Sequence, residues 1–524
     1  MAEKRLRVPN EDVRLREAEI AVTQTRTFQR LFFLKQLGLA YLVYPAASHT
    51  RGAHSIECLN QAVKILAALP REAKPSTEEE DAVRMAALLH DIGHVPFSHT
   101  LEDEHAILPK HDRGDRFSKV LDRLHEELGS EAAKRAVDAA RPILNALCEI
   151  PGFTQDWKSD LIGGTVCADL LAYITTDAAW TGIEKRPGYY RIYDYFEIRD
   201  ERLCIRLTKG GLRNYIVSSV MDLLDMRYAL TERVFFHHAK CVASAMLARA
   251  AMLCKLEDKD ELTTFGDERF LDYLGALGAK NKGGEHLIDC LRSRRLYKRI
   301  FKIGREAREG WDFGRGEGDF CSEWRNPDKV GDRLRSIEHM HKLPLGTLVL
   351  WCPDWRKMRK LVDAHVVWHS AGTLDGPHPL RSDELRQQFP GVAKRVANAE
   401  DQYLDLWTFW IAMDRDHLEK AARVVQSIED ELGIPCDPVF HSTYLIEIPG
   451  FGTGHKAQQA VRKTLEKLGP RVMANLDQQA ALDGQEHLDE TTILSATESA
   501  AHEQMASEQT TLFDDDISKP DGKK

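Results

Sequence analysis

Apolar residues recur every three or four positions through most of residues 1–310, and this helical period constrains the fold more than any other feature of the sequence. The period is clearest in five segments: 62–69, 79–94, 116–128, 131–150 and 233–256. Ser76 and the acids after it form a helix-start pattern ahead of the second segment. The sequence therefore predicts a mainly α-helical lobe over residues 1–310, with a short β-like piece near 189–206.

The pattern changes beyond residue 310. A Gly-, Asp- and Arg-rich stretch at 311–339 predicts a connector. Residues 340–475 predict a smaller α+β lobe, because short strand-like runs precede an amphipathic helix that a glycine ends. These elements lie at 346–353, 363–372, 406–413 and 414–433. Residues 476–524 are polar and acidic, and we expect a disordered tail there.

Composition excludes several classes of protein. The net charge of −10 belongs mostly to residues 481–524, where eleven acids face three lysines, so the rest is nearly neutral and duplex nucleic acid is disfavoured as a partner. No apolar run approaches the roughly 20 residues of a membrane-spanning helix, and the first residues lack a signal-peptide pattern. Ten cysteines without a C-x-x-C pair argue against a disulfide framework or a thiolate zinc site. We therefore expect a cytoplasmic protein.

The strongest chemical signal is the segment ALLHDIGHVPFSHT at 87–100. His90 and Asp91 are adjacent in an apolar helical pattern, and buried charges of this kind must be paired. One divalent cation would satisfy both. His94, four residues on, is expected to share a helical face with His90, and His99 follows Pro96, where a helix should bend or stop.

Further ligands for a cation lie on either side of this segment. His54 follows Arg51 by one helical turn, and Asp169, Tyr173 and Asp177 are four residues apart, on one face of a predicted helix. Each of these patterns alone also fits a helix cap or a solvated stripe. Their joint order, with six of the 21 histidines between 54 and 111, favours a metal site. Two imidazoles and two carboxylates suit one divalent ion per subunit, and the sequence does not distinguish Mn, Fe, Mg, Ni and Zn.

A family resemblance rests on three segments: FQRLFFLKQLGLAYLVYPAASHTRGAHS (28–55), LLHDIGHVPFSHTLEDE (88–104) and DLLAYITTDAAWTGI (169–183). They resemble the HD-domain phosphohydrolase superfamily, and within it the deoxynucleoside triphosphate (dNTP) triphosphohydrolases. The resemblance covers residues 20–255 and continues more weakly through 345–435. It implies a mainly α fold, an HD-domain helical bundle with a smaller α+β C-terminal lobe.

The resemblance also implies roles for individual residues. The metal ligands would be His54, His90, Asp91 and Asp169. Arg51 would contact substrate phosphate, and His99 would lie near the scissile phosphate. Glu102 would orient a proton-transferring histidine, for which His111 is the best match and His105 the rival; His94 is a further catalytic candidate. The substrate-binding set would be Gln36 at the sugar 3′-hydroxyl, Leu37 on the base, Tyr173 under the deoxyribose, Asp177 near the 3′-hydroxyl and Arg227 on phosphate.

The activity implied is metal-dependent hydrolysis of dNTPs to deoxynucleoside and triphosphate by a homo-oligomer, with an activator nucleotide and a role in dNTP-pool control or antiviral (phage) defence. Three positions depart from the family. Gln24 and Phe32 replace an Asp and an Arg that read a guanine activator, and Leu170 replaces a basic phosphate contact. Two alternatives stay open: another HD phosphohydrolase that acts on a nucleoside monophosphate or a cyclic or signalling nucleotide, and a non-enzymatic nucleotide-sensing interaction protein.

Overall fold

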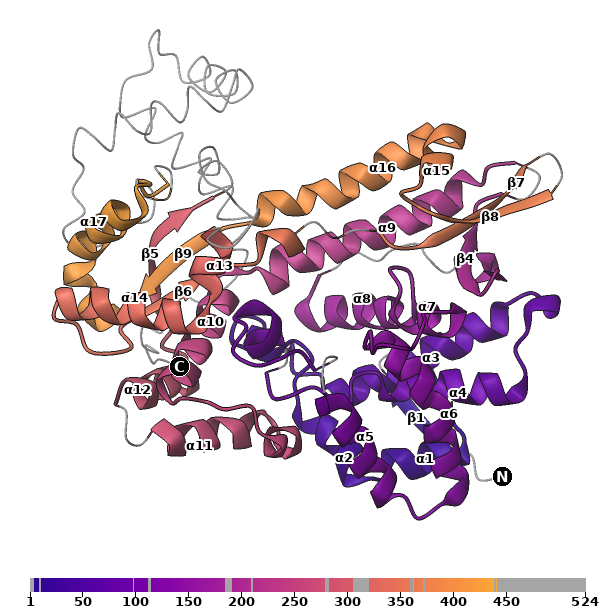
Figure 1. The fold of residues 1–524 in the computed structure, drawn as a ribbon, viewed down its shortest axis with the longest axis horizontal. Coiled ribbons are helices and arrows are strands. Elements are labelled where there is room, and N and C mark those ends of the chain that lie inside the picture. Colours follow the sequence, from indigo (N-terminus) through magenta and orange to yellow (C-terminus); the bar gives the residue numbers. More distant parts are fainter. Residues whose placement is uncertain are drawn as a thin grey trace, which may run out of the picture. The chain divides into compact units, whose positions relative to one another are not determined.

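The structure is a computed structural model, and helices dominate it, which confirms the predicted mainly α fold (Figure 1). It describes residues 4–8, 11–97, 99–111, 115–183, 191–208, 211–278, 282–304, 320–358, 360, 362–370, 373–437 and 440. The predicted tail at 476–524, and the last part of the predicted α+β lobe, lie outside these residues.

The helices and strands follow one another along the chain with few long gaps between them. The α-helices are α1 (Glu17–Thr23), α2 (Arg26–Gln29), α3 (Arg51–Ala68), α4 (Thr77–Leu89), α5 (Asp115–Glu127), α6 (Glu131–Leu147), α7 (Trp157–Gly163), α8 (Ala168–Thr181), α9 (Asn214–Leu230), α10 (His238–Leu253), α11 (Asp267–Gly278), α12 (Lys282–Arg292), α13 (Phe320–Arg325), α14 (Pro327–Met340), α15 (Asp383–Gln388), α16 (Pro390–Asp401) and α17 (Ala421–Leu432). The strands are β1 (Lys4–Val8), β2 (Glu11–Leu15), β3 (Phe196–Arg199), β4 (Arg202–Arg206), β5 (Lys298–Ile303), β6 (Leu348–Trp351), β7 (His365–Ser370), β8 (Thr373–Pro379) and β9 (Phe409–Met413).

Two compact units divide the chain. The first contains Met1–Arg299 and Ile303–His417, and the second contains Ile300–Lys302 and Leu418–Lys524. These bounds differ from those of the predicted lobes. The reason is that β7, which belongs to the predicted C-terminal lobe, pairs in parallel with β4 of the predicted helical lobe. Cys204 lies opposite His365 in this pair. The four-stranded sheet β3-β4-β7-β8 thus joins distant segments within the first unit.

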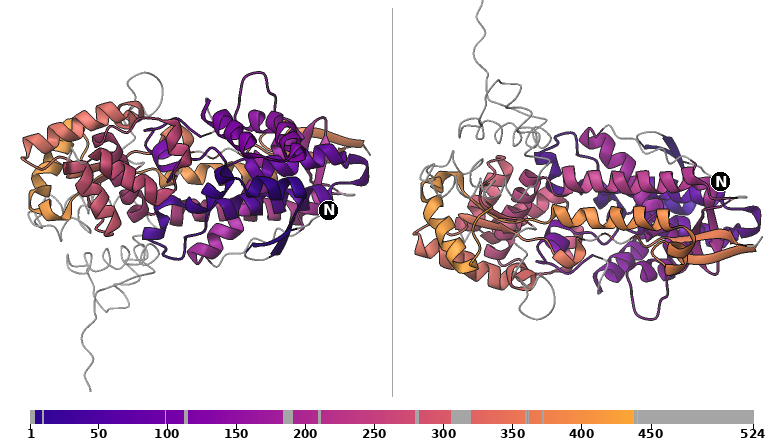
Figure 2. Two further views of the ribbon diagram at one scale, coloured as in Figure 1. Left: turned by 90° about the horizontal axis from the view of Figure 1, so that it is seen from below. Right: turned by 90° about the horizontal axis from the view of Figure 1, so that it is seen from above.

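A bundle of helices in the first unit surrounds an apolar core. Helix α3 packs on α4 and α8, and α4 packs on α6. Helix α4 begins as the sequence predicts: the Ser76 hydroxyl accepts from the backbone N–H of Glu79, whose carboxylate accepts from the N–H of Ser76. Helices α9 and α16 lie side by side (Figures 1 and 2). The bundle brings the first turns of α3 and α8 to the end of α4, where the candidate site lies.

Several segments depart from the sequence-based expectation. Residues 320–340 of the predicted 311–339 connector form α13 and α14 instead. Asn326 caps α14 and Pro327 opens it, while Val330, Leu334 and Ile337 bury one face. The predicted β-like piece near 189–206 contains a β3–β4 hairpin. The predicted helix at 414–433 starts with a 3₁₀ segment over Arg415–Lys420 and becomes α-helical in α17.

Candidate metal centre

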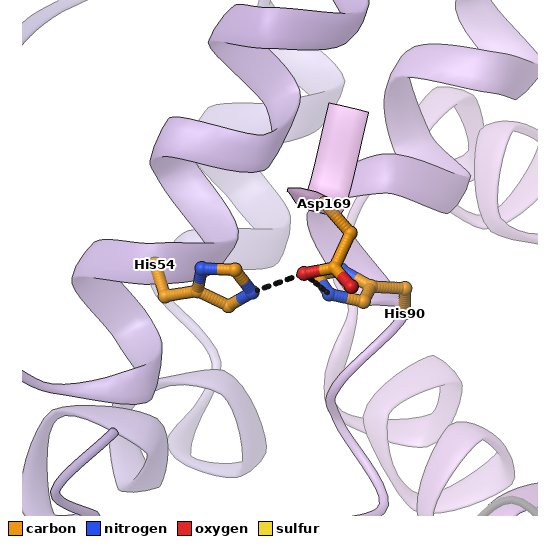
Figure 3. Close-up of side chains that lie close together, drawn as sticks. All are labelled: His54, His90 and Asp169. Atoms are coloured by element: carbon orange, nitrogen blue, oxygen red, sulfur yellow. Dashed lines mark ion pairs between the residues drawn. The ribbon is translucent and has the colours of Figure 1, made fainter. Parts of the chain in front are cut away.

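Three ligand side chains from three separate elements converge (Figure 3). His54 comes from the first turn of α3, His90 follows the last residue of α4, and Asp169 lies in the first turn of α8. Nε2 of His54 lies 3.0 Å from Oδ1 of Asp169, and Nε2 of His90 lies 3.8 Å from the same oxygen. One potential ligand atom from each residue lies within 4.8 Å of the other two, which is the spacing of donors around one ion.

Asp91 lies within ion-pair distance of two of these histidines and of Arg51. Its Oδ1 lies 3.5 Å from Nε2 of His90, and its Oδ2 lies 3.7 Å from Nε2 of His54. Arg51 donates a hydrogen bond to Oδ2 of Asp91. All four predicted ligands therefore gather in one place, and the predicted phosphate-binding arginine reaches the same carboxylate. With the side chain of Arg51 only 2% exposed, this is a buried pair rather than a surface contact.

The donor set fits a divalent cation. Nδ1 of His90 lies 2.9 Å from the carbonyl oxygen of Ala87 and donates a proton to it, so Nε2 is the ring nitrogen that can bind a cation in exchange for its own proton. Among the described residues this buried Nε2 has no hydrogen-bond partner. A buried polar atom without a partner is costly. Nε2 points toward Asp169, so a cation between the two would satisfy it, with His54 and Asp91 as further ligands.

Burial and charge act against each other on the site's pKa values. Burial disfavours the imidazolium of His90, but Asp91, Cys58 and Asp169 together outweigh it and raise the pKa of His90 well above its usual value. Burial likewise opposes ionisation of Asp91, yet His90 and Arg51 hold the pKa of Asp91 well below its usual range. The pKa of Asp169 is lowered in the same way, against its burial, by His54 and His90. The carboxylates are therefore ionised, as ligands of a cation must be.

The chain leaves the helix at His90, which corrects one prediction. Helix α4 ends at Leu89, and residues 90–93 form a turn, so His94 does not share a helical face with His90. Arg30 stabilises this turn, since its guanidinium donates to the carbonyls of His94 at 2.8 Å and Ile92 at 2.9 Å. The turn still brings Nε2 of His94 to 3.2 Å from Oδ1 of Asp91. Burial, aided by the charge of Arg51, lowers the pKa of His94 well below its usual value.

A second group of histidines lies beside the metal ligands. Oε2 of Glu102 is 2.9 Å from Nδ1 of His111, and the rings of His94 and His111 stack with centroids 3.4 Å apart. Glu102 belongs to a π-helical turn at Thr100–Glu104, a feature frequent at functional sites. His99 is half exposed, with its ring centroid 5.0 Å from that of His94.

Gly93 permits this close approach of the His111 segment. A Cβ atom at Gly93 would lie 3.1 Å from the carbonyl oxygen of His111 and 3.0 Å from the ring of Phe117. Both contacts are tighter than a methyl group normally makes. The glycine of the sequence HDIGH therefore fits the close packing beside the site, and a larger residue there would have to displace a neighbour.

His111 and His105, the two rivals in the sequence, lie in different surroundings. His111 is hydrogen-bonded to Glu102, as predicted for the proton-transferring histidine. His105 is buried with its ring against Trp351, at a centroid distance of 5.5 Å. Burial lowers the pKa of His105 to about 3. The geometry therefore favours His111 over His105 beside the metal ligands.

The remaining predicted substrate-binding residues line helix α8 and its neighbours. Asp169, Tyr173 and Asp177 do lie on one helix, as the spacing of four predicts. Arg227, near the end of α9, is within electrostatic range of Tyr173 and Asp169. Burial raises the pKa of the Tyr173 phenol, and the charge of Arg227 offsets only part of this rise. The phenol is therefore neutral. Leu170 is buried in the core, so no charge from that position reaches the site.

Asp177 has a partner that the sequence analysis did not find. Nε2 of His49 lies 2.8 Å from Oδ1 of Asp177, and the His49 ring stacks on Trp180. Gln36 is next to this pair, because its backbone N–H donates to the carbonyl of His49 at 2.9 Å. Leu37 is buried beside it. The two residues predicted for the sugar 3′-hydroxyl, Gln36 and Asp177, thus both contact His49, which no sequence spacing shows.

The similarity of this chain to known proteins agrees with the geometry. Residues 51–149 match the model of the HD domain, and residues 199–313 match that of the HD associated region. The chain contains an HD domain. Its resemblance to the HD-domain phosphohydrolase superfamily is thereby confirmed. Three of the four candidate ligands fall inside the matched domain, and Asp169 follows it.

Relatives of this HD-domain protein include MJ1154 of Methanocaldococcus jannaschii, 29% identical over 302 residues, which make up 56% of this chain and 58% of the relative. The deoxynucleoside triphosphate triphosphohydrolase SAMHD1 homolog of Dictyostelium discoideum is 25% identical over 299 residues, 53% of this chain and 56% of the relative. The matched part thus spans little more than half of each of these relatives.

A solved structure, of a phosphohydrolase from Bacteroides thetaiotaomicron, supports the fold. It has a TM-score of 0.56 at 19% identity, and the match covers 79% of this chain and all of that one. In the part of the chain that the structure describes, no helix is long and apolar enough to cross a membrane.

Proposed function

We propose that this protein is a metal-dependent phosphohydrolase that converts dNTPs to deoxynucleoside and triphosphate. One observation carries the proposal: the ligand atoms of His54, His90 and Asp169 lie within 4.8 Å of one another, beside Asp91 and its partner Arg51. The matched HD domain supports the reaction class, and the dNTP triphosphohydrolase among the relatives supports the substrate. The preferred dNTP and the native metal are left to experiment.

The cation would be held by His54, His90, Asp91 and Asp169, one divalent ion per subunit. When bound, such an ion supplies Lewis-acid polarisation of a phosphoryl oxygen and activation of a water nucleophile. The chain's own residues complete the chemistry. Arg51 is placed to neutralise charge on the scissile phosphate with its planar guanidinium, and Arg227 to bind phosphate on the side of Tyr173.

Proton transfer falls to the histidine group. Water attacks the α-phosphorus, the bond from phosphorus to O5′ breaks, and O5′ takes up a proton to leave as the nucleoside hydroxyl. His111, oriented by Glu102 at 2.9 Å, is positioned to relay that proton, and His99 is placed to donate it at the scissile phosphate. The proton that the attacking water loses restores the histidine. His94 stacks on His111 and fixes its ring.

Sugar selection would rest on Tyr173 and the Gln36–Asp177 region. A tyrosine ring packed against C2′ leaves no room for a 2′-hydroxyl, which favours deoxyribose. His49 holds Asp177 at 2.8 Å, so that carboxylate is fixed in place to accept from a 3′-hydroxyl. We also propose that the protein acts as a homo-oligomer, with nucleotide activation and a role in dNTP-pool control or phage defence as properties to be tested.

The test is a product assay on the purified protein with each of the four dNTPs and added Mn²⁺ or Mg²⁺. We expect deoxynucleoside and tripolyphosphate, and loss of both with His90→Ala. The matched control is His125→Ala, a partly exposed histidine on α5 paired with Asp138. Inorganic phosphate or a linear nucleotide as product would indicate another HD phosphohydrolase. No product from any dNTP, with or without activator nucleotides, would exclude the proposed activity.

A further inference from the structure

Arg325 contacts the π-helical turn Thr100–Glu104, although it lies outside both matched domains, which end at residues 149 and 313. Its Nη2 donates to the backbone carbonyl of Asp103 at 2.8 Å. Its Nη1 donates to the carbonyls of Glu104 at 3.2 Å and Cys352 at 2.7 Å. One guanidinium therefore joins the end of this turn, which carries Glu102, to the residue that follows β6.

The residues on either side of Arg325 hold its backbone in place. Trp324 is buried, and its ring meets that of Phe409 edge to face with centroids 5.3 Å apart. On the other side, Asn326 caps α14 and Pro327 is the first residue of that helix. Arg325 thus extends from between a buried ring and a helix cap, so its guanidinium reaches the turn from a fixed position.

The carbonyls that Arg325 contacts are the last two of the π-helical turn, Asp103 and Glu104. The final carbonyls of a helical segment have no helix N–H partners, and a cation beside them is favourable. The planar guanidinium can bond to several carbonyls at once, which a single ammonium group cannot do. The side chain of Glu104 is held separately, by Lys240 and Ser244. The backbone at the end of the turn is therefore the part that Arg325 stabilises.

The same turn orients both histidines that the proposed function assigns to proton transfer. Oδ2 of Asp103 lies 2.8 Å from Nδ1 of His99. Oε2 of Glu102 lies 2.9 Å from Nδ1 of His111. The two carboxylates belong to consecutive residues, and Arg325 bonds to the carbonyl of the second of them. A shift at the end of the turn would therefore move both carboxylates relative to their histidines.

We propose that Arg325 is a positioning residue for the hydrolysis. It holds the end of the π-helical turn, and through Glu102 and Asp103 it keeps His111 and His99 in place for proton transfer. This inference rests on the proposed function for the roles of the two histidines. Arg325 acts through the turn, without contact to the metal ligands.

The first test is steady-state dNTP hydrolysis by the purified full chain. Arg325→Gln should lower kcat by about tenfold, because small displacements of proton-transfer groups slow the chemical step. KM and the content of bound divalent ion should stay near the wild-type values. Arg325→Lys keeps the charge and should retain more of kcat than Arg325→Gln, which also guards against a variant that fails to fold. The matched control is Arg335→Gln, at an exposed position of α14 paired with Asp332.

A double variant separates positioning from a merely structural role. Arg325→Gln is combined with Glu102→Gln, and the kcat values of the two single variants and the double variant are compared. If Arg325 acts through Glu102, the loss that Arg325→Gln causes should be smaller in the Glu102→Gln background than in the wild type. Independent roles would instead give losses that multiply.

Hydrogen exchange reports on the turn without any substrate. The backbone N–H groups of Ile107 and Leu108 donate to the carbonyl of Leu101 at 2.7 and 3.0 Å. Both amides should exchange faster in Arg325→Gln, while those of α6 should exchange as in the wild type. The inference is overturned if exchange or kcat is unchanged, or if the two losses multiply. Faster exchange in the variant without dNTP hydrolysis by the wild type would keep the positioning of the turn and reject the proposed function. Hydrolysis with equal kcat in both proteins would do the reverse.

Discussion

Oε2 of Glu102 lies 2.9 Å from Nδ1 of His111, and Oε1 of the same carboxylate accepts from Nη1 of Arg116 at 3.0 Å. Both carboxylate oxygens are therefore occupied, and the buried Glu102 holds the His111 ring in one orientation. The ring's Nε2 is left as the atom that exchanges a proton. A carboxylate bonded to one ring nitrogen sets which nitrogen is left to exchange a proton.

Glu102→Gln should lower kcat for dNTP hydrolysis by about a hundredfold, within the usual range for general acid–base catalysis. An amide oxygen can still accept from His111 but cannot stabilise its positive charge. Metal content should stay unchanged in the variant. A variant with wild-type kcat would show that this contact has no catalytic role.

His90→Ala or Asp169→Ala should remove the bound divalent ion. Elemental analysis of the wild-type protein should find one equivalent of ion per chain, and each variant should lose most of it, because each removes a ligand from a mononuclear site. Adding Mn²⁺ should raise the Tm of the wild type and not of the variants. The control His125→Ala should keep both the ion and the rise in Tm.

Arg30→Lys tests whether Arg30 stabilises the turn at residues 90–93, which contains His90 and Asp91. The guanidinium bridges two carbonyls, those of Ile92 and His94, and a single ammonium group cannot reach both. The free energy of unfolding, measured in urea, should fall by roughly 2–3 kcal/mol, the cost of a lost hydrogen bond to a charged group. Mn²⁺ affinity should fall with it. Arg26→Lys, at an exposed position of α2, is the control, and an equal effect there would refute the role of Arg30.

His105 should make the fold sensitive to acid. Its pKa in the folded protein is lowered to about 3 by burial, whereas an unfolded histidine titrates near about 6.5. As the pH falls below about 6.5, the unfolded chain therefore takes up a proton that the folded chain does not, and stability is lost until the folded pKa is reached. His105→Gln removes this contribution, so its stability should change less than that of the wild type between pH 7.5 and 5. Equal losses in both proteins would show that His105 does not contribute.

The sequence predicts what depends on local pattern. The helical period gives α5, α6 and α10 with nearly correct bounds but only the last part of α3, and the Ser76 pattern gives the start of α4. The spacing of four puts Asp169, Tyr173 and Asp177 on one helix. The order of His54, His90, Asp91 and Asp169 along the chain predicts a ligand set whose four side chains the structure brings together.

What the sequence does not show depends on contacts between distant segments. The apolar period continues through His94, so the pattern cannot reveal that α4 ends at Leu89, a bend that Arg30 stabilises from 62 residues away. His49 and Asp177 are 128 residues apart, and only the packing of α8 brings them together. The glycine-rich composition near 311–339 also concealed α14, whose apolar residues follow a strong Asn-Pro start.

The central claim is that water attacks the α-phosphorus beside the His54–His90–Asp169 site. Hydrolysis of a dNTP in ¹⁸O-labelled water, followed by mass spectrometry of both products, tests it most directly. We predict one ¹⁸O atom in the released tripolyphosphate and none in the deoxynucleoside. Label in orthophosphate or in a nucleotide product, or label in the deoxynucleoside hydroxyl, would contradict it.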